Sequence, residues 1–254
     1  MTSITVVIPV LNDAAMLQRA LECLAEQLRP ADEIIVVDNG SADRSVAVAE
    51  AAGARVLHQP ITGIWPAAAA GYDAADSDII ARIDADSRPP VDWLAHIEAE
   101  FTSSPQIGAL TGPGDFYDGN GLVTLLGQNL YIGGFFWAMS IWLGNSPVFG
   151  SNFAMRRDVW MRTRGSVHST LRTIHDDLDL SMHLPLDVIV RLDETLRVGI
   201  SARPFATWRG FGRRLNWAFL TLRLHWPEQT PWRRRAARAA AEDGGGLIKA
   251  TGDG

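Results

Sequence analysis

The first hundred residues alternate short, apolar, β-branched segments with segments of helical periodicity. Strands are predicted at 4–10, 33–41, 54–58 and 79–83, and helices at 12–28, 43–52 and 64–75. The helix predicted over 12–28 places apolar residues three or four positions apart and begins at an Asn-Asp pair, as helices often do. Alternation of this kind is typical of an α/β fold in which a mostly parallel sheet is flanked by helices.

Two carboxylates follow the fourth predicted strand, in the segment ARIDADSRPP (81–90). Asp84 and Asp86 are separated by one residue, and two like charges this close are unfavourable unless a cation lies between them. The segment alone also allows a turn followed by a helix cap, because Asp and Ser favour both. Ligands of open α/β sheets bind beyond the carboxyl ends of the strands, so this position favours a divalent-metal site.

Composition narrows the class of protein. The chain has 254 residues and is 47% hydrophobic, which is enough for a sizeable core. Its single cysteine, Cys23, excludes an internal disulfide framework. The first apolar run contains Pro9 and has no basic region before it, unlike a secretory signal. We therefore expect a cytoplasmic protein.

The net charge of −6 is unevenly distributed, because residues 200–254 are basic and the rest of the chain is acidic. Between residues 203 and 238, arginines alternate with Trp, Phe and Leu, which predicts a basic, aromatic, helical segment over 201–243. This composition suits an anionic membrane surface, at the inner face of the plasma membrane. A pair of helices packed on the preceding domain explains it equally well. Nucleic acid is not expected as a partner, since no recognition motif is present.

Five segments, in order, resemble glycosyltransferase family 2: VVIPVLND, IIVVDNGSADRS, IIARIDADS, GSNFAMRRDVW and HDDLDLSMHL. The resemblance covers about residues 3–200. It implies an inverting, nucleotide-sugar-dependent hexosyltransferase with the GT-A fold. Residues 1–115 would form the nucleotide-sugar-binding half of this domain and residues 116–200 the acceptor half.

At the first two strands, the resemblance assigns Pro9, Val10 and Asn12 to the loop that contacts the nucleoside. It assigns Asp38 to a hydrogen bond with the base, usually uracil. The residues themselves also allow Asp38 to be a turn aspartate before Asn39-Gly40. A dinucleotide-binding dehydrogenase is excluded, because G-x-G-x-x-G does not follow the first strand.

The pair Asp84 and Asp86 matches the D-x-D motif of the family. The resemblance implies that Asp86 is the principal ligand of Mg²⁺ or Mn²⁺, with Asp84 near the ribose or the waters of the metal. Such an ion stabilises the negative charge that develops on a nucleotide-diphosphate leaving group. Haloacid-dehalogenase phosphatases also use D-x-D, but after their first strand.

The segment HDDLDLS (175–181) resembles the acidic motif on the acceptor side of the family. By this alignment Asp177 is the general base, Asp176 takes the acceptor-binding Glu position, and Asp179 follows. Neighbouring acids are expected to raise the pKa of one another, which helps a base. The alternative is a helix start, where Asp complements the amide dipoles. His175 is expected to be structural, with metal or acceptor contact as the alternatives.

The segment GSNFAMRR (150–157) resembles the loop that lines the donor sugar, with Asn152 as its hydrogen-bonding residue. Trp160 follows it and is assigned to acceptor binding, as a ring that stacks on a sugar. Core packing is the alternative for any one tryptophan.

The chain departs from the family pattern at Ala67-Ala68-Ala69, where many relatives carry an Ala-Arg-Asn-type triplet. This leaves the identity of the nucleotide open. It also keeps two alternatives: an inactive nucleotide-sugar-binding relative, and a nucleotidyltransferase of similar topology.

The stretch from 119 to 155 contains no charged residue and is long enough to span a bilayer. A single crossing would place Asp84 and Asp177 on opposite sides of the membrane. We therefore expect buried core or an in-plane or re-entrant element. The acceptor implied by the resemblance is a glycan or a lipid-linked molecule. Residues 244–254, with three consecutive glycines, are predicted to be disordered.

Overall fold

A computed structural model describes residues 2–118, 133–203 and 208–250. Its strands are β1 (Ile4–Val10), β2 (Glu33–Asp38), β3 (Arg55–His58), β4 (Ile79–Arg82), β5 (Ile107–Thr111), β6 (Gly114–Phe116), β7 (Phe153–Arg156), β8 (Ile189–Leu192) and β9 (Val198–Ile200). Its helices are α1 (Ala14–Ala25), α2 (Ser45–Ala51), α3 (Ile64–Ala74), α4 (Trp93–Ser103), α6 (Gly133–Leu143), α7 (Arg157–Thr163), α8 (Asp176–His183), α9 (Trp208–Leu224) and α10 (Pro231–Ala250).

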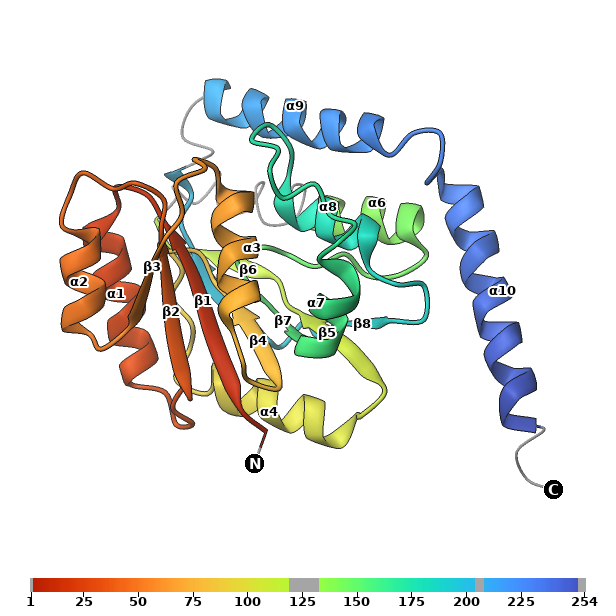
Figure 1. The fold of residues 1–254 in the computed structure, drawn as a ribbon, viewed down its shortest axis with the longest axis horizontal. Helices are drawn as coiled ribbons and strands as arrows, with labels where there is room; N and C mark the ends of the chain where they lie inside the picture. The colour runs from red at the N-terminus through yellow and green to blue at the C-terminus, as the bar shows by residue number, and fades with distance from the viewer. Residues whose placement is uncertain (1, 119–132, 204–207, 251–254) are drawn as a thin grey trace.

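The main sheet has seven strands in the order β3-β2-β1-β4-β7-β5-β8 (Figure 1). Only β7 runs antiparallel to its neighbours, β4 and β5. β6 and β9 form a separate parallel pair. The predicted α/β fold with a mostly parallel sheet is therefore confirmed.

Side chains of β1 alternate between two hydrophobic clusters, as the period of a strand requires. Val6 and Ile8 pack with α1 and α4 on one face, whereas Val7 packs with α3 on the other. Burial on both faces explains why this strand reads as a continuous apolar run.

The Ala67-Ala68-Ala69 triplet lies in the contact between α3 and the sheet and is buried. The backbone approach is close: a Cβ atom added at Gly71 would lie 2.3 Å from Cγ1 of Val7. Small residues on this helix therefore serve packing against the sheet, and the triplet does not line the cavity described below.

The C-terminal helices extend beyond the sheet (Figure 1). α9 lies over α8, and α10 begins at Pro231 and contacts α6. The structure corrects the prediction of disorder for residues 244–250, because α10 continues to Ala250. The remainder of that predicted tail, 251–254, and residues 119–132 of the uncharged stretch lie outside the described residues.

Among the described residues, no helix is both long enough and apolar enough to cross a membrane. The described part of the uncharged stretch includes α6, which buries Phe136 and Leu143 but leaves Trp137 70% exposed. This helix is therefore only half buried.

Candidate active site

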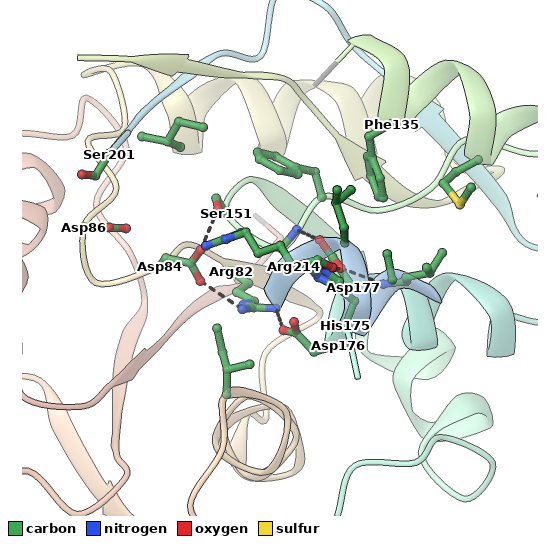
Figure 2. Close-up of a pocket in the computed structure, with 18 of the residues that line it drawn as sticks. Arg82, Asp84, Asp86, Phe135, Ser151, His175, Asp176, Asp177, Ser201 and Arg214 are labelled. Atoms are coloured by element: carbon green, nitrogen blue, oxygen red, sulfur yellow. Dashed lines mark hydrogen bonds and ion pairs between the residues drawn. The ribbon is translucent and has the colours of Figure 1, made fainter. Parts of the chain in front are cut away.

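A cavity of about 310 Å³ lies between the C-terminal end of β4 and the N-terminal end of α8. Asp84 and Asp86 reach it from the loop after β4, and Asp176 and Asp177 from the first turn of α8 (Figure 2). Gly150 and Ser151, just before β7, form part of its wall. The fold thus brings the two acidic motifs of the sequence into one cavity.

Arg82 is buried between these motifs, with 1% of its side chain exposed. Its Nη1 donates to Asp176 Oδ2, and its Nη2 lies 3.0 Å from Asp84 Oδ1 (Figure 2). Burial alone would lower the pKa of Arg82, but the charge of Asp176 raises it well above its usual value. Arg82 is therefore a permanent cation that compensates both carboxylates.

Asp84 has partners for both of its carboxylate oxygens. Oδ1 faces Arg82, and Oδ2 accepts a hydrogen bond of 2.6 Å from Ser151 Oγ. Ser87 Oγ accepts a hydrogen bond from the Asp84 backbone N–H at 3.1 Å. These contacts fix the Asp84 carboxylate just beyond the C-terminal end of β4.

Asp86 lies in a different electrostatic environment. Burial, followed by the charge of Asp84, raises the pKa of Asp86 to about 6. The opposing influence is Arg203, whose Nη2 lies 3.1 Å from Asp86 Oδ2 and 2.6 Å from Asp13 Oδ2. Burial and the charge of Asp84 both disfavour an isolated negative charge on Asp86, so a cation bound beside this carboxylate would be stabilising.

Asp177 is held by backbone amides and by His175. Its Oδ2 accepts a 3.2 Å hydrogen bond from Gly150 N–H, and its Oδ1 accepts one of 2.8 Å from Leu178 N–H. His175 Nδ1 lies 3.5 Å from Oδ1 and its Nε2 donates to the Arg214 carbonyl at 3.1 Å.

The pKa values of the two neighbouring acids shift in opposite directions, so the expected rise is found for Asp176 but not for Asp177. Burial raises the pKa of Asp176. Burial also opposes ionisation of Asp177, but the hydrogen bond and charge of His175 lower the pKa of Asp177 below its usual value. Asp177 is therefore an ionised carboxylate, stabilised by His175 and by the backbone N–H groups of Gly150 and Leu178.

The other half of the cavity is apolar. It is lined by side chains of α6, α8, α9 and the β6–β9 pair: Phe116, Phe135, Met139, Phe149, Leu178, Ile200, Leu215, Ala218 and Leu222. One cavity therefore combines a carboxylate cluster with a hydrophobic wall.

The residues predicted for the nucleoside lie at the neighbouring strand ends and not in this cavity. Val10 is opposite Asp38 in the β1–β2 register. The Asp38 carboxylate accepts the backbone N–H groups of Gly40 and Ser41 at 3.3 and 3.1 Å, which is the turn arrangement. Asn12 has a φ of 52° and its Oδ1 accepts from Ala42 N–H at 2.7 Å. Pro9 is buried in β1.

Asn152 and Trp160 do not line the cavity. Asn152 is fully buried; its Oδ1 accepts from Trp93 Nε1 at 2.9 Å and its Nδ2 donates to the Leu196 carbonyl at 2.6 Å. Trp160 is 1% exposed and donates to Asp73 at 2.8 Å. Both side chains hold secondary-structure elements together, which is the packing alternative for the tryptophan.

The sequence did not single out the apolar wall, nor four polar lining residues: Arg82, Ser151, Ser201 and Arg214. Arg82 had a detectable signal, because a charged residue inside an otherwise apolar buried strand requires a partner. Arg214 lies in the basic segment, where the pattern does not distinguish it from the other arginines.

Comparison with known proteins identifies the family. The model described as Glycosyl transferase family 2 matches residues 5–163, more than half of the chain. The protein therefore belongs to glycosyltransferase family 2, as the sequence motifs predict.

Curated relatives match part of the chain. An uncharacterized glycosyltransferase of Mycobacterium tuberculosis is 37% identical over 99 residues, which are 39% of this chain and 44% of that protein. An undecaprenyl-phosphate 4-deoxy-4-formamido-L-arabinose transferase of Pseudomonas fluorescens is 32% identical over 108 residues, covering 38% of this chain and 32% of that protein. The match thus spans less than half the length of these relatives.

Solved structures share the fold. Glucosyl-3-phosphoglycerate synthase of M. tuberculosis, in complex with Mn²⁺, UDP and glucosyl-3-phosphoglycerate, superposes with a TM-score of 0.55 at 22% identity, covering 78% of this chain and 71% of that one. Residues 1–349 of S. aureus TarS give a TM-score of 0.61 at 16% identity, covering 80% and 61%. These similarities confirm the GT-A fold.

Proposed function

We propose that this protein is a metal-dependent inverting glycosyltransferase that moves a sugar from a nucleotide-diphosphate sugar to an acceptor hydroxyl. The observation that carries the proposal is the convergence of Asp84, Asp86 and Asp177 on one cavity. The first two follow a strand end, where nucleotides bind in open α/β sheets. The third lies in the first turn of α8, at the place that an acceptor would approach.

The residues around Asp86 fit a divalent cation. Its carboxylate oxygen is a ligand that Mg²⁺ and Mn²⁺ prefer, and Asp84 lies two residues away. The ion would replace the Arg203 guanidinium as the positive partner of Asp86. When bound, it would stabilise the charge of the nucleotide-diphosphate leaving group.

Asp177 would act as the general base. The acceptor hydroxyl oxygen forms a bond to the anomeric carbon while the bond between that carbon and the phosphate oxygen breaks, and the leaving diphosphate takes the electron pair. Asp177 accepts the hydroxyl proton as this bond forms. The amides of Gly150 and Leu178 hold its carboxylate in place, and His175 keeps it ionised before the reaction.

The apolar half of the cavity favours an acceptor with a hydrophobic part, such as a lipid-linked or cell-envelope glycan. A carbohydrate alone does not need the wall formed by Phe135, Leu215 and Leu222. One curated relative, the Pseudomonas transferase, is named for undecaprenyl phosphate, a lipid. The same class of acceptor would therefore place its polar group near Asp177 and its chain along α6 and α9.

The C-terminal helices carry exposed side chains suited to an anionic membrane surface. Phe219, in α9, is 61% exposed. Trp226, between α9 and α10, is 49% exposed, and Trp232, in α10, is 62% exposed. Arg213, Arg223 and Arg233 are exposed among them. Aromatic and basic side chains on one segment bind the headgroup region of anionic bilayers. We propose peripheral attachment through this segment.

A panel of nucleotide sugars tests the proposed reaction. Thermal unfolding would be followed with each donor, in the presence and absence of Mn²⁺, and turnover would be followed with a labelled donor. A bound donor raises the unfolding temperature according to its concentration relative to Kd. Mn²⁺-dependent stabilisation by one donor, followed by sugar transfer, is expected. Binding without transfer to any lipid-linked or glycan acceptor would favour an inactive relative, and release of diphosphate from a nucleoside triphosphate would favour a nucleotidyltransferase.

A further inference from the structure

Three of the six histidines of the chain meet at one buried carboxylate outside the cavity. Asp179 and His183 belong to α8, His168 lies in the loop before that helix, and His225 follows the last residue of α9. The imidazole centroids lie 4.8 to 5.5 Å apart. One potential ligand atom from each of the four residues lies within 4.8 Å of the others.

The Asp179 side chain is fully buried, yet no arginine or lysine pairs with it among the described side chains. Its Oδ2 accepts hydrogen bonds of 2.8 Å from Trp65 Nε1 and from the His168 backbone N–H. Its Oδ1 faces His168 Nδ1 at 2.8 Å, His225 Nε2 at 3.4 Å and His183 Nδ1 at 3.5 Å. A buried carboxylate without a cation is costly, so the positive charge has to come from within this cluster.

Hydrogen bonds to backbone carbonyls fix the tautomers of two of the imidazoles. His225 Nδ1 lies 2.7 Å from the Thr221 carbonyl oxygen, and His183 Nδ1 lies 2.8 Å from that of Asp179. A carbonyl can only accept, so each Nδ1 carries the hydrogen. In the neutral rings the lone pair is then on Nε2. Metal-binding histidines in proteins are oriented by the same kind of contact.

His225 Nε2 is buried and has no hydrogen-bond partner in the described structure. Its side chain is 2% exposed, and it faces the Asp179 oxygen. Burial lowers the pKa of His225, and the charges of His168 and Arg234 lower it further. Burial also lowers the pKa of His183, with His225 and His168 adding to the effect. A lone pair and a carboxylate oxygen at this distance repel each other unless a positive ion lies between them.

We propose that His168, Asp179, His183 and His225 form a structural Zn²⁺ site. Neutral imidazoles and a carboxylate are zinc ligands, and four of them complete the closed tetrahedral set of a structural site. Zinc bonds of about 2.0–2.1 Å place tetrahedral ligand atoms about 3.3 Å apart. The 3.4 Å between His225 Nε2 and Asp179 Oδ1 already matches this spacing, and the His168 contact needs to open by only a few tenths of an ångström.

Such an ion would attach the end of α9 to α8. α8 carries Asp176 and Asp177 at its first turn, and α9 contributes Leu215 and Leu222 to the cavity. The site would therefore fix the apolar wall relative to the proposed base. This inference stands on the four residues of the cluster and is independent of the proposed transfer reaction.

Metal content of the full, untagged chain tests the proposal. The Asp86→Ala background removes the metal ligand proposed at the donor site. After removal of metal with a chelator and dialysis against Zn²⁺, we expect about one bound zinc per chain by elemental analysis. With Co²⁺ in its place, the intense visible absorption of a tetrahedral ion is expected. No zinc bound, or cobalt with only weak octahedral absorption, would overturn the site.

Single variants locate the ion. Loss of even an outer-shell partner weakens metal affinity about 10–100-fold, so His225→Gln is expected to weaken zinc binding about 100-fold or more. His168→Gln, at a side chain 36% exposed, gives a second variant in case His225→Gln does not fold. His58→Gln is the matched control, because it removes an imidazole 3.3 Å from the Asp38 carboxylate elsewhere in the fold, outside every cluster of potential metal ligands among the described residues. Wild-type zinc content in the two cluster variants, or equal loss in the control, would refute the assignment.

Discussion

Arg82, at the end of β4, forms a buried ion pair with Asp176, the first residue of α8. This contact joins the strand that carries the D-x-D motif to the helix that carries the proposed base. Arg82→Gln is expected to destabilise the fold by about 3–5 kcal/mol, because it leaves a buried carboxylate without its cation. Urea unfolding followed by circular dichroism measures this change.

The double variant Arg82→Gln/Asp176→Asn is the control for that prediction. Removing both charges avoids the uncompensated carboxylate, so the double variant should be less destabilised than the sum of the two single variants. Additive losses would show that the two side chains are not coupled.

Asp177→Asn is expected to bind the donor with near-normal affinity but to lose about 10²–10⁴ in kcat, the usual range for a removed general base. Initial rates with a labelled nucleotide sugar measure this loss. The assignment is wrong if the variant keeps most of its kcat. Asp176→Asn serves as the comparison. Because this variant breaks the ion pair with Arg82, it is expected to lose stability and not to show a selective loss of rate.

Asp86→Ala is expected to abolish metal-dependent nucleotide binding while the far-ultraviolet circular dichroism stays unchanged. The carboxylate is the proposed principal ligand, and no backbone element depends on its side chain among the contacts that the structure describes. Calorimetric titration with Mn²⁺ and donor tests this. Asp76→Asn, at a side chain that is 90% exposed, is the matched control and should bind as wild type does. Normal Mn²⁺ binding by Asp86→Ala would remove this residue from the metal site.

Metal binding should depend on pH through Asp86. Its pKa is raised to about 6, and only the ionised form binds the cation, so affinity for Mn²⁺ is expected to fall as the pH decreases through about 6. Arg203 lowers this pKa, and Arg203→Gln should therefore move the midpoint to higher pH. Titrations between pH 5 and about 8 measure both curves. An unchanged midpoint in the variant would show that Arg203 does not control the ionisation of Asp86.

Membrane attachment is expected to depend on the exposed aromatic residues of the C-terminal segment. Phe219→Ser and Trp232→Ser should each weaken cosedimentation with anionic vesicles at low salt, and high salt should release the wild type. Leu28→Ser is the control, since Leu28 is 72% exposed but lies just after α1. Equal binding to neutral and anionic vesicles at low salt would return α9 and α10 to a packing role.

Local patterns in the sequence were sufficient for the fold class and for the position of the acidic motifs. Helical periodicity and apolar runs are properties of neighbouring residues, so α1 and β1 could be located within a few positions. The D-x-D pair followed from a strand end, because the edge of a parallel sheet is the place where ligands bind.

Tertiary contacts decided which polar residues face the cavity and which hold the core together. Asn152 and Trp160 lie in segments that the motifs assigned to the site, but both side chains are buried and hydrogen-bonded inside the fold. The sequence pattern also did not predict the ion pair between Arg82 and Asp176, or decide whether Asp38 binds the backbone N–H groups of its own turn.

The sequence by itself therefore determined the family, the α/β architecture and the carboxylates that the site contains. Only the tertiary structure decided their electrostatics and the meeting of His168, His183 and His225 at Asp179. The reason is physical: burial and charge pairing depend on residues far apart in the chain, such as Arg82 and Asp176, which are separated by 94 positions. A pattern that extends over one helix or strand carries no information about such a partner.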